Sequence, residues 1–179
     1  MRTRGDKIHI LRLDIQHFDR FGRLKWEALG LKNLLHDEGE QALLSAYFAT
    51  AYSGYGAPPA NLYLGLDNRV SLAEADTLLS LSGEPVGNGY ARIALLTSGT
   101  GVGGQDFVIS QPAAYYQALS KTVTFTATGS AWSAVRNMFL CTVASGTTGK
   151  LICSLALTAI RTLQVGDSLN ASILTGMSE

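Results

Sequence analysis

The sequence predicts a mainly β protein, an antiparallel β-sandwich of the jelly-roll or immunoglobulin-like kind with one or two short helices and an N-terminal β-hairpin arm. Three observations predict it. Charged residues make up only 16% of the 179 residues, glycine occurs 19 times, and short stretches of alternating apolar and polar residues recur between glycine-rich turns. Low charge and abundant glycine argue against a bundle of long helices with charged outer faces. The length suffices for one domain with a substantial core.

The first 36 residues are expected to form a basic β-hairpin arm. They carry a net charge of +4 from eight Lys and Arg and four Asp and Glu, whereas residues 37–179 carry six and ten, a net −4. Residues 7–15 alternate with one change of phase, which predicts a strand, with a bulge at that change. Residues 19–22 supply turn chemistry, and residues 24–28 alternate again. An arm of this charge would suit an acidic surface on another subunit.

Residues 37–179 are expected to form the sandwich body with two short helices. Acidic residues followed by apolar residues at helical spacing predict a helix near 38–50. Ser71 and Glu74 have the spacing of a capping box, which predicts a second helix near 72–81. The strands are expected at 61–66, 90–96, 107–109, 122–128, 135–143, 150–157 and 162–174, with turns at 145–149 and 166–167.

The sequence contains no convincing catalytic, cofactor or metal motif. Residues 99–104 fit the glycine spacing of a dinucleotide loop, but a strand-like segment follows instead of a helix, so a plain loop is expected. His36 adjoins acidic residues that are better explained as the start of a helix than as metal ligands. Cys141 and Cys153 lie in apolar runs and are expected to be reduced core thiols. No signal peptide is visible, and no apolar run approaches the length of a membrane span.

Seven segments share glycine- and aromatic-rich turns: 18–27, 33–40, 61–66, 87–92, 125–132, 149–152 and 165–169. Together they resemble structural proteins of tailed bacteriophages. The resemblance implies a non-enzymatic virion component, assembled in the host cytoplasm, with no catalytic, cofactor-binding or metal-binding residues. The first expectation is a capsid decoration (cement) protein that stabilises the lattice of the major capsid protein. The alternative is a tail or head-fibre component that binds a carbohydrate or receptor.

Five residues are the predicted partner-interface residues, because aromatic and arginine side chains commonly anchor interfaces. They are Phe21, Arg23 and Trp26 in the hairpin and Tyr52 and Tyr55 in the loop that follows the first helix. The expected partners are the major capsid protein or other virion subunits and further copies of the chain in a homo-oligomer. Direct nucleic-acid binding and membrane binding are not expected. An enzyme that cleaves peptidoglycan is the third reading, which scarce acidic residues in the β region disfavour.

Overall fold

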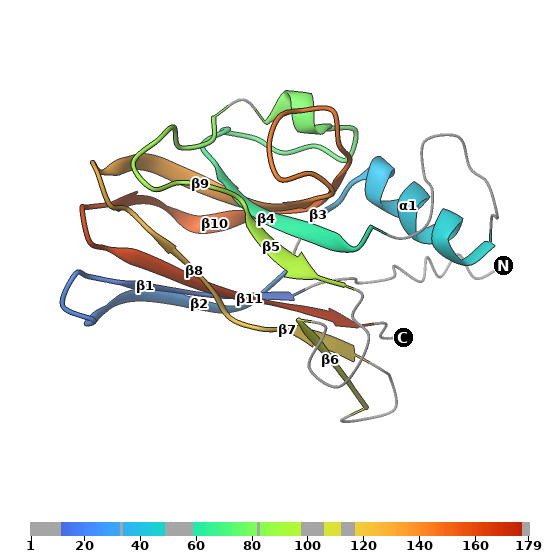
Figure 1. The fold of residues 1–179 in the computed structure, drawn as a ribbon, viewed down its shortest axis with the longest axis horizontal. Helices are drawn as coiled ribbons and strands as arrows, with labels where there is room; N and C mark the ends of the chain where they lie inside the picture. The colour runs from blue at the N-terminus through green and yellow to red at the C-terminus, as the bar shows by residue number, and fades with distance from the viewer. Residues whose placement is uncertain are drawn as a thin grey trace, which may run out of the picture.

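The protein is a β-sandwich of two antiparallel sheets, which confirms the predicted fold class (Figure 1). The computed structural model describes residues 12–32, 34–48, 59–81, 83–97, 106–111 and 117–176. The predicted interface residues Tyr52 and Tyr55 and the glycine loop 99–104 lie outside these residues.

The first sheet, sheet A, has the strand order β2-β1-β11-β7-β6, with β8 also paired to β11. Strand β1 pairs with β2 on one side and with β11 on the other, all antiparallel. The strands are β1 (Arg12–Phe18), β2 (Leu24–Lys32), β6 (Phe107–Ser110), β7 (Gln117–Ser120), β8 (Val123–Thr126) and β11 (Ser168–Gly176).

The second sheet, sheet B, has the order β3-β10-β9-β4-β5. Its strands are β3 (Leu34–Leu35), β4 (Asn61–Asp67), β5 (Ile93–Leu96), β9 (Trp132–Cys141) and β10 (Leu151–Leu163). The helical elements are α1 (Asp37–Phe48) and the 3-10 turn η1 (Leu78–Ser80). Among the described residues, no helix is long and apolar enough to cross a membrane.

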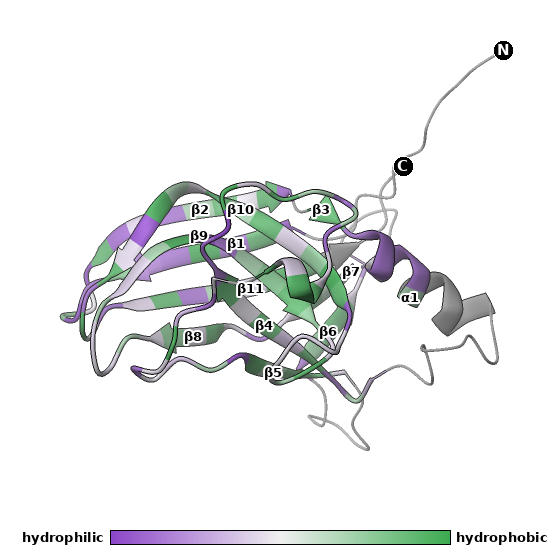
Figure 2. Cartoon of the chain, turned by 90° about the horizontal axis from the view of Figure 1, so that it is seen from above, coloured by the Kyte–Doolittle hydropathy of each residue, from purple (hydrophilic) through white to green (hydrophobic). Residues whose placement is uncertain are grey.

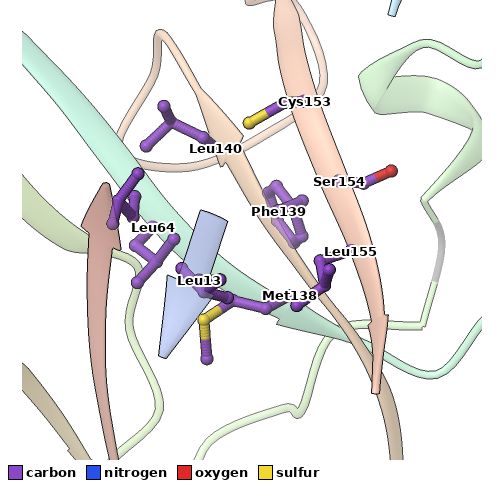
Figure 3. A pocket seen from close by; sticks show the side chains of 9 residues that line it. Leu13, Leu64, Met138, Phe139, Leu140, Cys153, Ser154 and Leu155 are labelled. Atoms are coloured by element: carbon purple, nitrogen blue, oxygen red, sulfur yellow. The ribbon is translucent and has the colours of Figure 1, made fainter. Parts of the chain in front are cut away.

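The main core lies between the sheets. Alternating side chains point inward, for example Leu13 and Ile15 of β1 and Leu169, Ala171 and Ile173 of β11, and all five are buried. Figure 2 shows this alternation as changes of hydropathy along the strands. Close packing leaves a void of about 20 Å³ among apolar side chains, including Leu13, Leu64 and Met138 (Figure 3). That volume is comparable to a single water molecule, so the void is a packing defect and not a ligand site.

A second core lies on the outer side of sheet B. Leu78 and Leu81 of the segment 68–92 pack there against Phe139, Cys141 and Leu151, which are all buried. We call this segment the cover. The continuous burial of residues 137–141 and 151–155 follows from it, because each strand is covered on both faces. Cys141 and Cys153 are buried and not in disulfides, as predicted.

The predicted helix at 72–81 is wrong, and only the short turn η1 forms. The Glu74 carbonyl accepts hydrogen bonds from the Asp37 N–H, at 3.1 Å, and from His36 Nδ1, also at 3.1 Å. The Asp76 carboxylate accepts from the Ala73 N–H at 2.7 Å and pairs with Arg69 at 2.8 Å. A helix over 72–81 would need the Glu74 carbonyl for its own hydrogen bonds, so the bonds from His36 and Asp37 compete with the helix signalled by the capping-box spacing.

The predicted helix at 38–50 is confirmed as α1. The Glu38 carboxylate accepts hydrogen bonds from Lys150 Nζ at 2.9 Å and from the Leu151 N–H at 3.0 Å, which ties the first turn of the helix to β10. Gly39 permits this close packing, because a Cβ atom there would lie 2.0 Å from the Ile152 carbonyl oxygen.

The N-terminal hairpin forms as β1 and β2, but it is not a separate arm. Strand β1 pairs with β11 from Arg12 to Phe18, and its residues Leu13 and Ile15 belong to the main core. Strand β1 therefore joins the hairpin to the sandwich, because its inward alternation supplies apolar side chains that the core needs. A bulge in β2 opposite Asp14 is fixed by the Gly30 N–H, which donates to the Asp14 carboxylate at 2.7 Å.

Candidate partner-binding surface

The turn between β1 and β2 is held by Asp19. Its Oδ1 accepts hydrogen bonds from the Phe21 and Arg23 N–H groups, both at 2.9 Å, and its Oδ2 accepts from Arg23 Nε at 2.7 Å. The hydrogen bond from the Arg23 backbone is the largest of the effects that hold the pKa of Asp19 below its ordinary value. The carboxylate therefore stays ionised at neutral pH and keeps the turn in one conformation.

This turn presents Phe21 to solvent. The ring is 67% exposed, and the guanidinium carbons of Arg20 and Arg23 lie 4.7 Å and 5.3 Å from its centroid. Leu24 at the start of β2 is also exposed. An exposed aromatic ring flanked by two arginines combines the residue types that most often dominate binding energy at interfaces.

The turn between β10 and β11 lies beside this hairpin turn. A Cβ atom on Gly166 would lie 2.8 Å from Cβ of Arg20, so the absence of a side chain allows the two turns to touch. The neighbouring Val165 is exposed. We define the hairpin surface as Arg20, Phe21, Arg23, Leu24 and Val165.

A buried polar cluster supports the hairpin surface from within. Asp167 Oδ2 accepts hydrogen bonds from Lys25 Nζ at 2.8 Å, from the Gln164 N–H at 3.1 Å and from His17 Nε2 at 3.2 Å. Burial disfavours the ionised carboxylate, but these hydrogen bonds outweigh it and lower the pKa of Asp167. Burial, together with the charges of Lys25 and Arg161, lowers the pKa of His17 despite its bond to Asp167.

His17 is therefore neutral at pH 7, and we assign its proton to Nε2, which faces Asp167. The His17–Asp167 pair has the form of an acid–base pair, but His17 is only 3% exposed, so a substrate has no direct access to it. Among the described residues, no group of His, Cys, Asp and Glu side chains is arranged to hold a metal ion. The arrangement fixes the geometry of two turns.

The structure brings Phe21 and Arg23 together and places Trp26 differently. Trp26 is half-buried against the main core, and the guanidinium carbon of Arg161 lies 3.9 Å from the centroid of its ring system. Because Trp26 belongs to β2 and Arg161 to β10, this contact clamps the two sheets together at the hairpin end. The role of Phe21, Arg23 and Trp26 in a partner interface remains a prediction. The same holds for Tyr52 and Tyr55.

Sequence reasoning missed the polar cluster. His17 lies within β1, beyond the strand predicted at residues 7–15, and Asp167 was predicted only as a turn residue. The two residues are 150 positions apart in the sequence, and no local spacing signals their contact. The inward phase of the β1 alternation, which includes position 17, was the one available hint.

Comparison of the sequence with known protein families gives one match. A family model described as "Podophage GP4 fiber I protein gp80" matches residues 35–176. No curated protein and no solved structure matches the chain. The match covers the strands of both sheets except β1, β2 and the first residue of β3, so the hairpin that carries Phe21 lies outside it. Because the match spans more than half of the sequence, the chain belongs to the Podophage GP4 fiber I protein gp80 family and is a structural protein of a bacteriophage virion.

Proposed function

We propose that the protein is a subunit of a phage fibre and that it attaches to another particle protein through the hairpin surface. The family description, which names a fibre protein, supports the fibre role over capsid decoration, the first expectation from the sequence. The role is one of binding, with no catalytic step.

The exposure of Phe21 between two arginines is the observation that carries the attachment proposal. Burying this ring at an interface would remove apolar surface from water, and Arg20 and Arg23 would pair with carboxylates around it. The partner surface is therefore expected to combine an apolar pocket with acidic residues.

The hairpin surface is also organised before it binds. Asp19 fixes the turn, and the cluster of Lys25, His17 and Asp167 fixes the strands below it. A surface that is already ordered loses less conformational entropy on association, so more of its contact energy contributes to affinity.

The test is incorporation into particles. Phage lacking the gene is complemented with wild-type protein, with Phe21→Ala or with Arg23→Glu, and the copies per purified particle are counted by mass spectrometry. Leu29→Ala is the matched control, because Leu29 is an exposed apolar residue of the same hairpin outside the hairpin surface. We expect both turn variants to reduce incorporation at least about tenfold and the control to match wild type. Full incorporation of folded Phe21→Ala and Arg23→Glu proteins would refute the attachment site.

The copy number of the wild-type protein separates the two particle roles. A fibre attached at symmetric positions is expected in small multiples set by cyclic symmetry, on the order of three to twelve copies per attachment site. A protein that decorates the whole shell would be present in hundreds of copies. A count that follows the number of shell subunits would favour decoration over the fibre role.

A further inference from the structure

Arg161, near the end of β10, is a partly buried cation that no described residue pairs with an anion. Its guanidinium carbon lies 3.9 Å from the centroid of the Trp26 ring system, and its Nε–H is buried without a hydrogen-bond partner. No salt bridge or hydrogen bond joins the rest of the guanidinium group to the described residues. Because a charge that is partly removed from water is costly until it is paired, Arg161 lacks a partner that such a group normally has.

The ends of this guanidinium group remain accessible. Only Nε is enclosed without a partner, so the two terminal nitrogens, which are also unpaired within the described residues, keep contact with solvent. Trp26 covers one face of the planar group, and the flanking residues Ile160 and Thr162 are exposed. A planar cation held on an aromatic ring presents N–H groups at its edge, where an acceptor from outside the chain can bind.

Arg92 shows how the fold treats a comparable arginine. Its guanidinium carbon lies 5.2 Å from the centroid of the Phe139 ring, and the group pairs with the Glu84 carboxylate and donates to the Val143 carbonyl. Burial disfavours the charged form of Arg92, but the hydrogen bond to Glu84 and its charge outweigh this effect and raise the pKa. At Arg161 burial alone acts, and it lowers the pKa. An anion that pairs with Arg161 must therefore come from another molecule.

Arg161 lies at the hairpin end of the sandwich. Figure 1 shows the β10–β11 turn and the β1–β2 turn at the same end of the molecule, and Trp26 follows Leu24 of the hairpin surface on β2. Lys25, between these two residues, is paired with Asp167 at 2.8 Å, and His17 is neutral. The charge of Arg161 is therefore the unmatched one in this group of side chains, and it continues the hairpin surface towards sheet B.

These features favour a carboxylate as the ligand. A guanidinium group and a carboxylate fit each other through two parallel N–H···O bonds, and arginine keeps its charge at neutral pH. A carboxylate carries a single negative charge, which matches the one unpaired positive charge at this site. A phosphate group would carry more negative charge than Arg161 alone balances, because Lys25 is already paired with Asp167.

We propose that Arg161, held on Trp26, is a second anchor of the attachment surface and binds an Asp or Glu side chain of the particle protein that receives the hairpin surface. This inference rests on the attachment proposed above and extends it from sheet A to sheet B. The interface then contains two kinds of anchor, the exposed ring of Phe21 and a guanidinium group positioned by an aromatic ring.

The first test counts copies per purified particle in phage complemented with Arg161→Gln, which removes the charge and keeps a polar side chain. Arg12→Gln is the matched control, because Arg12 is an exposed arginine at the opposite end of β1 from the hairpin turn. We expect incorporation to fall at least about tenfold for Arg161→Gln and to match wild type for the control. The melting temperature of Arg161→Gln should fall by less than about 4 °C, since the contact with Trp26 is lost but no charge loses a partner.

The second test identifies the partner group. A carbodiimide reagent joins an amine directly to a carboxylate that contacts it, and it does not couple a guanidinium group. Particles that contain Arg161→Lys should therefore gain a crosslink from position 161 to an Asp or Glu of another particle protein, which mass spectrometry locates. Particles with the wild-type protein and particles with Arg12→Lys should lack this crosslink.

Three results would overturn the inference. They are wild-type incorporation of Arg161→Gln, a loss of incorporation accompanied by a larger fall in melting temperature, which would indicate a structural role alone, and incorporated Arg161→Lys protein that gives no crosslink to another particle protein. Failure of the attachment itself gives a different pattern. Loss of incorporation in Phe21→Ala with full incorporation of Arg161→Gln would refute the Arg161 anchor alone, whereas full incorporation of both would refute the attachment surface.

Discussion

The outer faces of the two sheets are used in opposite ways. The cover buries part of the outer face of sheet B, where Phe139 and Leu151 are as inaccessible as residues of the main core. On the outer face of sheet A, side chains such as Arg12, Asp14 and Thr124 are exposed. The comparison teaches that sheet B buries much of its outer face as part of folding, whereas sheet A leaves its outer face and its hairpin end open to solvent.

The largest expected effect on the free energy of unfolding is that of replacing Arg92 in the cover. This buried residue pairs with Glu84 at 2.5 Å, donates to the carbonyls of Val143 at 3.1 Å and Gly146 at 2.9 Å, and lies 5.2 Å from the centroid of the Phe139 ring. Arg92→Ala leaves Glu84 without its charge partner, so the free energy of unfolding should fall by about 3–5 kcal/mol. Chemical denaturation measures this loss.

The control for that prediction is Arg12→Ala on the exposed face of sheet A, which should change the free energy of unfolding by less than about 0.5 kcal/mol. Equal losses for the two arginine variants would contradict the division between a committed and an open sheet.

The next largest effect on the free energy of unfolding is expected from the apolar contacts of the cover. Leu78 is fully buried against sheet B, whereas its neighbour Leu79 is 73% exposed. Leu78→Ala should lower the free energy of unfolding by about 2–4 kcal/mol, because it removes buried methyl groups and leaves a cavity, and Leu79→Ala should change it by less than about 0.5 kcal/mol. A Leu78→Ala protein as stable as Leu79→Ala would mean that the cover is not part of the core.

Each region also contains a buried histidine that should make the fold sensitive to acid. Burial lowers the pKa of His17 at the hairpin end and of His36, whose Nε2 lies 2.7 Å from Ser154 Oγ beneath the cover. The unfolded chain takes up protons near the ordinary value of 6.5, and the folded chain does so only at lower pH. The free energy of unfolding should therefore be highest above about pH 7, where both histidines are neutral in either state. It should fall as the pH drops below about 6.5, because the unfolded chain then binds protons that the folded chain does not.

Unfolding measured across this range should show the decline in the wild type and a smaller decline in His17→Gln and in His36→Gln. Glutamine does not titrate and keeps polar groups near Asp167 or Ser154. A wild-type free energy of unfolding that stays constant from about pH 7 to pH 5 would show that neither histidine is held neutral by the fold.

The smallest effect is expected on the open face of sheet A. Thr124 Oγ1 donates to Asn170 Oδ1 at 2.8 Å across β8 and β11, and both groups are near solvent. Thr124→Val keeps the branched shape and removes this bond, so the free energy of unfolding should change by less than about 0.5 kcal/mol. A loss above about 1.5 kcal/mol would show that this face contributes to folding as the cover does.

The features that depend on neighbouring residues could be predicted from the sequence. Most strands of both sheets, the helix α1 and the exposed turn with Phe21 and Arg23 were predictable, since alternation and turn chemistry reflect the two faces of a strand and the residues between strands. Strand β7 was missed because the four residues Gln117–Ser120 are too short to show a period.

The rest depended on contacts between distant residues. The cover is held by side-chain carboxylates bonded to backbone groups of an irregular segment, which left only one 3-10 turn where a helix was predicted. The cluster around Asp167 joins residues from β1, β2 and the β10–β11 turn. Such sites follow from the topology, which no single window of sequence contains.

Photo-crosslinking in assembled particles tests the central claim most directly. A photoreactive amino acid replaces Phe21 in one protein and Val70, an 82% exposed residue of the cover, in another. The account predicts that position 21 crosslinks to a second particle protein at a segment containing acidic residues, and that position 70 does not. Incorporated protein that yields no crosslink from position 21, while position 70 reacts with a particle protein, would contradict it.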